Sequence, residues 1–273
     1  MSLLERSLTG GGLAVAVILL RALAINHLPK RSFLALWGVV LARLLLPYRI
    51  PLPVPVPLLQ SKLPTAVISA PLPQAPVTVQ TVPNIPAAVP AAEAAAGPDL
   101  LPLLWAAGAL ALALFFLVSY NKWRWIFRTS LPVENPFAKT WLAEHPLRRT
   151  VSVRQSDRIA APLTYGLLRP VILVPAALDW TEHKTLHYIF AHEYVHIRRF
   201  DAAGKLLLAG TLCVHWFNPV VWVMYVLANR DLELSCDEAV VRQFGGGNKS
   251  RLEYVLALLA MEEQRSGLAH LNF

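Results

Sequence analysis

The sequence predicts a mainly α-helical membrane protein that also carries a smaller, water-facing α+β domain. Of its 273 residues, 55% are hydrophobic and 15% are charged, and the mean hydropathy is +0.47. A soluble domain usually has about a quarter of charged residues, so this composition argues against one soluble domain and against disorder. Apolar stretches lie before Asn121, whereas most titratable residues follow it. Basic cytoplasmic loops explain the net charge of +8, and we expect no direct binding to nucleic acid.

Three apolar stretches are long enough to predict membrane-spanning helices. About 20 apolar residues in a helix cross the ~30 Å hydrocarbon layer of a bilayer. We expect two spans within the first 48 residues, at 8–28 and 32–48, and a third at 100–120. Arg21 and Arg43 interrupt the first two spans. Because a charge inside the membrane is costly, each arginine should either reach the membrane surface or face the interior of a helix bundle.

Basic residues also predict the orientation of these spans. The link between the first two spans reads NHLPKR, and the segment after the third reads NKWRWIFR. Basic loops usually face the cytoplasm, so we expect the N-terminus outside and residues 121–273 inside a cell membrane. Residues 49–99 would then be outside. They are rich in proline, which disfavours helices and central strands, and we expect an irregular extracellular loop.

The water-facing part begins with a predicted small sheet. Residues 151–154 alternate between apolar and polar side chains, as a half-buried strand does. A second short strand is bounded by prolines, which favour the edge of a sheet. Such an edge can bind an extended peptide as an added strand, and an edge with no ligand is the alternative. The predicted peptide-binding edge strand consists of Val171, Ile172, Leu173 and Val174.

A metal-binding motif lies on the helical pattern that follows these strands. His192, Glu193 and His196 form an HEXXH motif, and residues four apart share one helix face. Both imidazoles can therefore point at one cation. Two histidines and a third protein ligand are a common coordination of catalytic Zn²⁺. We predict one zinc ion per chain, with Glu193 beside it as the general base.

A second helical pattern, at residues 229–244, offers the third ligand. Glu233 and Asp237 are four residues apart and share a face. Such a pair can supply one metal ligand and one outer acceptor that holds a histidine N–H, and two solvated acids are the alternative. Asp201, five residues after His196, is a further candidate for an outer acceptor.

The segment between the two patterns, residues 205–228, is apolar enough for a fourth span. A straight helix of this length measures ~36 Å, which would place Glu233 across the membrane from the histidines. Pro219 lies in the middle of the segment, where a helix would break. We therefore expect a membrane-associated hairpin of two short helices that turns at 215–219 and has both ends in the cytoplasm. A true span is the alternative.

The two cysteines, Cys213 and Cys236, fall within or beside apolar stretches. Two cysteines are too few for a metal cage or a disulfide framework. We expect both to be buried, reduced thiols.

Three motifs occur in this order in the sequence: HEYVHIRRFD, HWFNPVVW and ELSCDEAV. In these motifs the sequence resembles the BlaR/MecR family of membrane zinc metallopeptidases. These are the antibiotic-sensing signal transducers of Gram-positive bacteria. The resemblance implies a zincin-like (gluzincin) domain with His192, His196 and Glu233 as zinc ligands and Glu193 as the general base. In the sensor members, a β-lactam acylates an extracellular domain, and the activated peptidase cleaves itself and drives loss of a transcriptional repressor. We expect this chain to carry the peptidase without the sensor domain.

The predicted function is therefore an integral-membrane zinc endopeptidase of the bacterial cell membrane. It would cleave a cytoplasmic protein, either a transcriptional repressor or itself, in a signalling response related to β-lactam resistance. A membrane quality-control protease of the HtpX kind and a non-catalytic regulatory scaffold are the alternatives. The ELSCD and HWFNP strings favour the first function, and a scaffold has no use for Glu193. The expected partners are the lipid bilayer and the protein substrate, and homodimerisation stays open.

Overall fold

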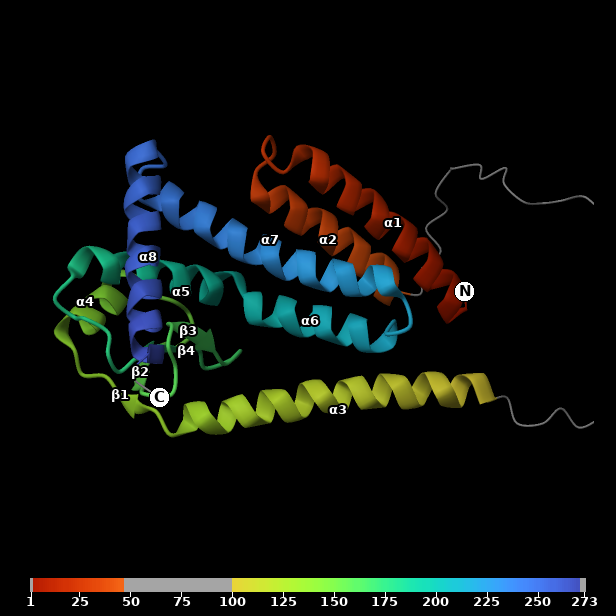
Figure 1. Cartoon of the computed structure of the whole chain (residues 1–273), viewed down its shortest axis with the longest axis horizontal. Helices are drawn as coiled ribbons and strands as arrows, with labels where there is room; N and C mark the ends of the chain where they lie inside the picture. Colours follow the sequence, from red (N-terminus) through yellow and green to blue (C-terminus); the bar gives the residue numbers. More distant parts are fainter. Residues whose placement is uncertain (1, 47–99, 271–273) are drawn as a thin grey trace, which may run out of the picture. The chain divides into compact units, whose positions relative to one another are not determined.

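The computed structural model describes residues 2–46 and 100–270, with side chains up to residue 259. Of these, residues 2–46 and 101–270 belong to one compact unit. The described residues form eight helices and a four-stranded sheet, which confirms a mainly helical protein with a small sheet (Figure 1). The predicted extracellular loop at 49–99 lies outside the described residues.

Within the described residues, two helices are long and apolar enough to cross a membrane. These are α1 (Leu3–Ala24) and α3 (Leu100–Arg128). The second predicted span forms α2 (Lys30–Leu45), whose 16 residues measure ~24 Å and fall short of the ~30 Å hydrocarbon layer. The helix ends because Leu46 is extended, as expected for a residue that precedes a proline.

A helical hairpin forms where the sequence predicts one. Helix α6 (Asp201–Val214) and helix α7 (Pro219–Gln243) contact each other, and the chain reverses between them. Asn218 caps α7 through its side-chain oxygen, and the proline that follows suits the first helical position. Helix α7 is longer than expected. No glycine or proline interrupts the chain before Gly245, so the second hairpin helix and the pattern at 229–244 are one helix.

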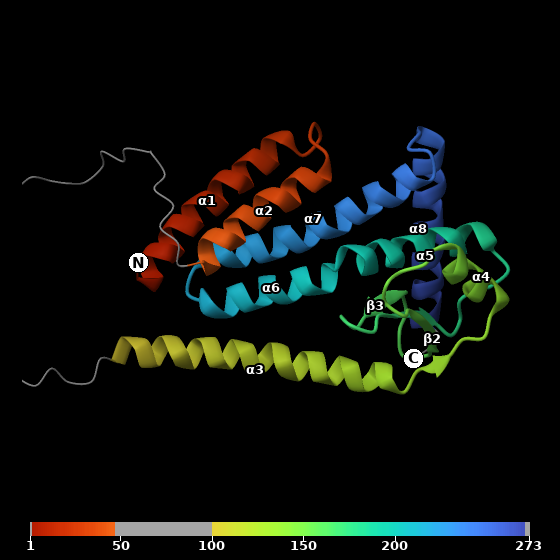
Figure 2. The same cartoon turned by 180° about the vertical axis from the view of Figure 1, so that it is seen from behind.

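Helices α1, α2, α6 and α7 run side by side and share one hydrophobic core (Figures 1 and 2). Buried side chains from α2, α6 and α7 fill it, including Phe33, Trp37, Leu44, Leu212 and Met224. The tip of the hairpin is held by polar contacts: Asn218 donates to Ser7, and the His215 ring lies 3.3 Å from the Leu44 carbonyl. The tip of the hairpin therefore lies beside the start of α1 and the end of α2.

The sheet contains β1 (Leu131–Pro132), β2 (Ser152–Ser156), β3 (Leu163–Tyr165) and β4 (Val171–Pro175), in the order β1-β2-β4-β3. Strand β4 pairs parallel with β2 and antiparallel with β3. Helices α4 (Pro136–Glu144), α5 (His183–Arg199) and α8 (Asn248–His270) complete this part of the chain. The second hydrophobic core lies here, and α5 contributes Leu186, Ile189 and Phe190 to it.

The predicted edge strand is wrong, because β4 has a partner on both sides. The prediction relied on the two prolines that bound the strand. They lie just before β4 and at its last residue, where the missing N–H costs few of the hydrogen bonds between strands. The edge strands of the sheet are β1 and β3 instead. Three of the four residues predicted to bind a peptide are completely buried; the four are Val171, Ile172, Leu173 and Val174.

Candidate metal centre

Helix α5 brings the three residues of the HEXXH motif together. The Nε2 atoms of His192 and His196 are 3.0 Å apart, because the two residues are one helical turn apart on the same face. Their side chains are 20% and 12% exposed, so the pair is largely shielded but open on one side. Glu193 is buried beside them.

The other ring nitrogen of each histidine, Nδ1, contacts side chains that lie farther from the two Nε2 atoms. His196 Nδ1 lies 2.7 Å from an oxygen of Asp201, which returns to the histidine because Phe200 adopts a left-handed conformation between α5 and α6. His192 Nδ1 lies 2.9 Å from the Tyr254 hydroxyl and 3.3 Å from Asp237. The hydroxyl in turn donates to Asp237 at 2.6 Å. The structure thus brings both predicted outer acceptors to the histidines.

These contacts show that the two histidines suit a cation. In the neutral form of each imidazole, an Nδ1 that donates its hydrogen to these outer groups leaves the lone pair on Nε2, where a cation can bind. Two lone pairs that face each other at 3.0 Å repel, unless a positive charge lies between them. The outer acceptors are also of the kind that orients metal-binding histidines in proteins.

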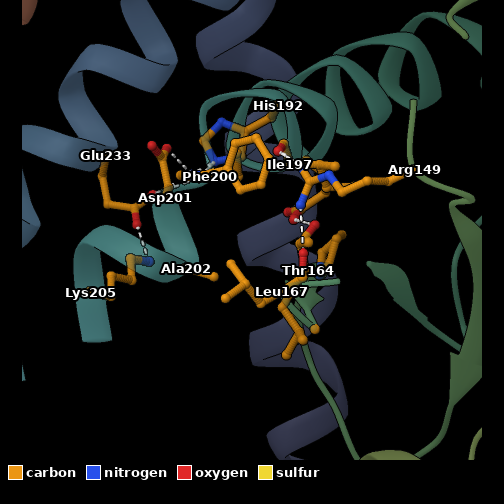
Figure 3. A pocket seen from close by; sticks show the side chains of 15 residues that line it. Arg149, Thr164, Leu167, His192, Ile197, Phe200, Asp201, Ala202, Lys205 and Glu233 are labelled. Carbon is orange, nitrogen blue, oxygen red and sulfur yellow. Dashed lines mark hydrogen bonds and ion pairs between the residues drawn. The ribbon is translucent and has the colours of Figure 1, made fainter. Parts of the chain in front are cut away.

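Glu233 reaches the same point from α7. Its Oε2 lies 3.2 Å from His196 Nε2 and 3.7 Å from His192 Nε2. Zinc bonds of ~2.0–2.1 Å in a tetrahedron separate two ligand atoms by about 3.3 Å, so the three atoms have suitable spacings for one zinc ion. Lys205 holds the other carboxylate oxygen, Oε1, at 2.8 Å (Figure 3). The hairpin makes this possible, since α6 and the first part of α7 each measure ~21 Å in opposite directions.

The charges at the centre shift the pKa values of its groups. Burial by itself lowers the pKa of His196, but hydrogen bonds with Asp201, Cys236 and Glu233 outweigh it and raise that pKa to about 11. Burial by itself raises the pKa of Glu233, but the two imidazoles and Lys205 outweigh it and lower that pKa. The centre therefore favours a positive charge on its histidine side and an ionised carboxylate opposite.

Glu193 lines a cavity together with the two histidines. Thr164 of β3 donates to its Oε2 at 2.5 Å. The cavity measures about 230 Å³, and Arg149, Thr164 and Lys205 line it together with the histidines (Figure 3). A second, more apolar cavity of about 520 Å³ is walled by α8 and shares His192 and Glu193 with the first. Two cavities thus adjoin the HEXXH motif.

Sequence reasoning did not identify four residues of this centre. The sequence contains no spacing pattern relative to the histidines that would mark Thr164, Lys205 or Tyr254. Cys236 was expected only as a buried thiol; it is buried, and its Sγ donates to the His192 carbonyl at 3.4 Å. Together with the two histidines it forms a group of three that could hold a metal, which makes it the competitor of Glu233. Cys213 is half-buried instead of buried, and both thiols are free.

An HEXXH helix, a carboxylate from a second helix and an adjoining cavity define a centre of the metallopeptidase class. Residues 1–270 match the family described as BlaR1 peptidase M56. The chain therefore belongs to this peptidase family, which confirms the resemblance seen in the sequence.

Regulatory proteins of antibiotic resistance are among its relatives. The chain is 30% identical over 121 residues to the regulatory protein BlaR1 of Bacillus licheniformis, a stretch that covers 43% of this chain and 20% of the relative. It is 23% identical over 144 residues to the methicillin resistance mecR1 protein of Staphylococcus aureus, covering 51% of this chain and 25% of the relative. The matches thus span about a fifth to a quarter of these relatives. Membrane-protein relatives and two candidate spans support a membrane location.

Proposed function

We propose that the protein is an integral-membrane zinc metalloendopeptidase that cleaves a cytoplasmic protein in a signalling response related to β-lactam resistance. The substrate is a transcriptional repressor or the chain itself. The observation that carries the proposal is the triangle formed by two imidazole nitrogens and one carboxylate oxygen, beside a buried glutamate. The family and the relatives named above support the same reading.

In this proposal, His192, His196 and Glu233 would hold the zinc ion. When bound, the ion would act as a Lewis acid toward a peptide carbonyl and would lower the pKa of a water to about 7. Glu193 would accept a proton from the attacking water and pass it to the leaving amine. Thr164 holds the Glu193 carboxylate by a hydrogen bond, which restricts its rotation. Both imidazoles are kept in the tautomer and orientation that zinc requires by their contacts with Asp201, Asp237 and Tyr254.

The substrate peptide lies along β3 in this proposal. Leu163–Tyr165 is an edge strand, and Thr164 within it contacts Glu193. An edge strand binds an extended peptide through its free backbone groups, whatever the side chains of that peptide. Strand β3 therefore replaces Val171–Val174 as the substrate-binding strand.

We also propose the orientation that the basic loops predict. The N-terminus and residues 49–99 are then outside the cell, and the metal centre is in the cytoplasm. Labelling of single cysteines introduced at residue 27, in the loop between α1 and α2, and at residue 245, after α7, tests it. Both positions should react only after the cytoplasmic side is opened. Reaction of either one in intact cells contradicts the orientation.

Metal analysis and substrate mapping test the function. Purified protein should contain about one zinc ion per chain, as two histidines and a glutamate imply. Co-expression with candidate repressors should then produce new protein termini, which mass spectrometry maps. Protein that binds no zinc under any condition contradicts the proposal.

Substitution of Tyr254 by phenylalanine should weaken zinc binding. It removes the hydroxyl that accepts the N–H of His192, and loss of such outer groups typically costs 10–100-fold in metal affinity. We expect about tenfold, because Asp237 remains 3.3 Å away and can accept the same hydrogen. Competition with a chromophoric chelator measures the effect. Tyr188→Phe is the matched control, since its hydroxyl joins α5 to α8 through Glu253 without touching a histidine.

A further inference from the structure

Helix α7 presents carboxylates on two faces. Glu233 and Asp237 lie on the face that meets the histidines of α5. Asp231 and Glu238, seven residues apart, lie on the face that meets α1 and α2. One rigid helix therefore connects the metal centre to the N-terminal helices.

The contact on the second face is a buried cluster of three side chains. Asp231 is completely buried and accepts hydrogen bonds from Arg21 Nε at 2.8 and 2.9 Å. Trp37 donates its ring N–H to the same carboxylate at 2.8 Å. Arg21, one of the two arginines within predicted spans, thus faces the bundle interior, and its side chain is only 11% exposed. The cluster joins α1, α2 and α7 at one point.

This cluster is well placed to fix the rotation of α7 about its own axis. Residues two apart on a helix point about 200° apart, so Asp231 and Glu233 face in nearly opposite directions. A rotation of about 20° moves an atom ~6 Å from the helix axis by ~2 Å. Such a shift would take the Glu233 oxygen out of bonding range of the cation. Apolar packing alone tolerates small rotations, whereas an aspartate held from two directions does not.

We propose that Arg21 and Trp37 are positioning residues of the peptidase: by anchoring Asp231, they set the rotation of α7 that places Glu233 at the metal. The proposal rests on the proposed function, because it takes Glu233 as a zinc ligand. It goes further in assigning the N-terminal helices α1 and α2 a part in building the centre. Glu238, which accepts the Lys30 backbone N–H at 2.8 Å, adds a second anchor on the same face.

The test uses the full chain in detergent and replaces the charged pair by apolar residues. Removing one partner alone would leave a buried charge, whereas an apolar pair of similar volume usually preserves folding. The variant Arg21→Met/Asp231→Leu should therefore fold, and we expect it to bind zinc about tenfold more weakly than the wild type. Trp37→Phe keeps an aromatic side chain, although a smaller one, and loses the hydrogen bond to Asp231, and it should show a smaller loss. Phe33→Leu is the matched control, because it loosens the same core without touching Asp231.

A second measurement does not depend on zinc. Cys236 lies on the metal-centre side of α7 and is buried against α5, so rotation of α7 should expose its thiol. In a Cys213→Ser background and in the presence of a chelator, a maleimide should label Cys236 at least about tenfold faster in the double variant than in the wild type.

These two measurements separate the inference from the proposed function. Weaker zinc binding and faster labelling in the double variant, with neither change in Phe33→Leu, support it. Unchanged values in both Arg21→Met/Asp231→Leu and Trp37→Phe overturn it, and so do equal changes in the Phe33→Leu control. If the wild type binds no zinc, the proposed function fails and the placement of Glu233 at a metal fails with it, while the labelling rates still show whether Arg21 and Trp37 set the rotation of α7.

Discussion

Replacing Glu193 with glutamine should slow peptide cleavage at least about 100-fold while leaving the zinc content unchanged. Glutamine has the same shape and can still accept the hydrogen bond from Thr164, but it cannot take up a proton. Proton transfer by a well-placed side chain contributes about 10²–10⁴-fold, so the cleavage rate should fall by that factor. Metal analysis and cleavage of a mapped substrate measure the two quantities on the same sample.

Glu182→Gln is the control for this experiment. It makes the same chemical change at an exposed position just before α5. Its activity should equal that of the wild type. Retained cleavage in Glu193→Gln would remove the general base from the mechanism, and loss of zinc in that variant would show that Glu193 is a ligand instead.

Replacing Glu233 with alanine should remove most of the bound zinc, and activity with it. Loss of an outer group typically costs 10–100-fold in metal affinity, so loss of a direct ligand should cost more than about 100-fold. A chelator competition at fixed pH measures the zinc dissociation constant. Lys205 then loses its carboxylate partner, and Lys205→Met in the wild-type background shows how much of the effect comes from that ion pair.

Cys236→Ser distinguishes the two candidate third ligands. The Cys236 thiol is close to both histidines, but it donates to the His192 backbone carbonyl. The Glu233 oxygen instead completes the triangle with both Nε2 atoms. We therefore expect Cys236→Ser to change zinc affinity by less than about threefold, well below the 10–100-fold typical of outer groups. The opposite ranking, with the serine variant losing zinc and Glu233→Ala keeping it, would make Cys236 the ligand.

The parts of the fold that follow from local sequence could be predicted. The HEXXH spacing fixes which side chains share a helix face, and Pro219 with its Asn218 cap marks the turn of the hairpin. The resemblance pointed to Glu233 as the third ligand, and the hairpin then followed from a length argument: a straight segment would carry Glu233 too far from the histidines. Each of these rests on contacts within a helix or on its length.

Features that depend on pairing between distant segments could not be predicted. The order of the sheet places β3 outside β4, although β3 has only three residues and a weak strand pattern. Tyr254 reaches His192 because α8 packs against α5, and no spacing in the sequence predicts that contact. Arg21 illustrates the same limit, since its choice between the membrane surface and the bundle interior depends on Asp231, 210 residues away.

The continuity of α7 has a consequence for how such an enzyme can be controlled. A single helix supplies both a wall of the apolar bundle and a proposed ligand of the catalytic ion. In the proposed function, a fragment that keeps Glu233 on an intact α7 therefore also keeps an apolar wall of the bundle. In the proposed orientation, cleavage is confined to proteins that come to the inner surface of the membrane.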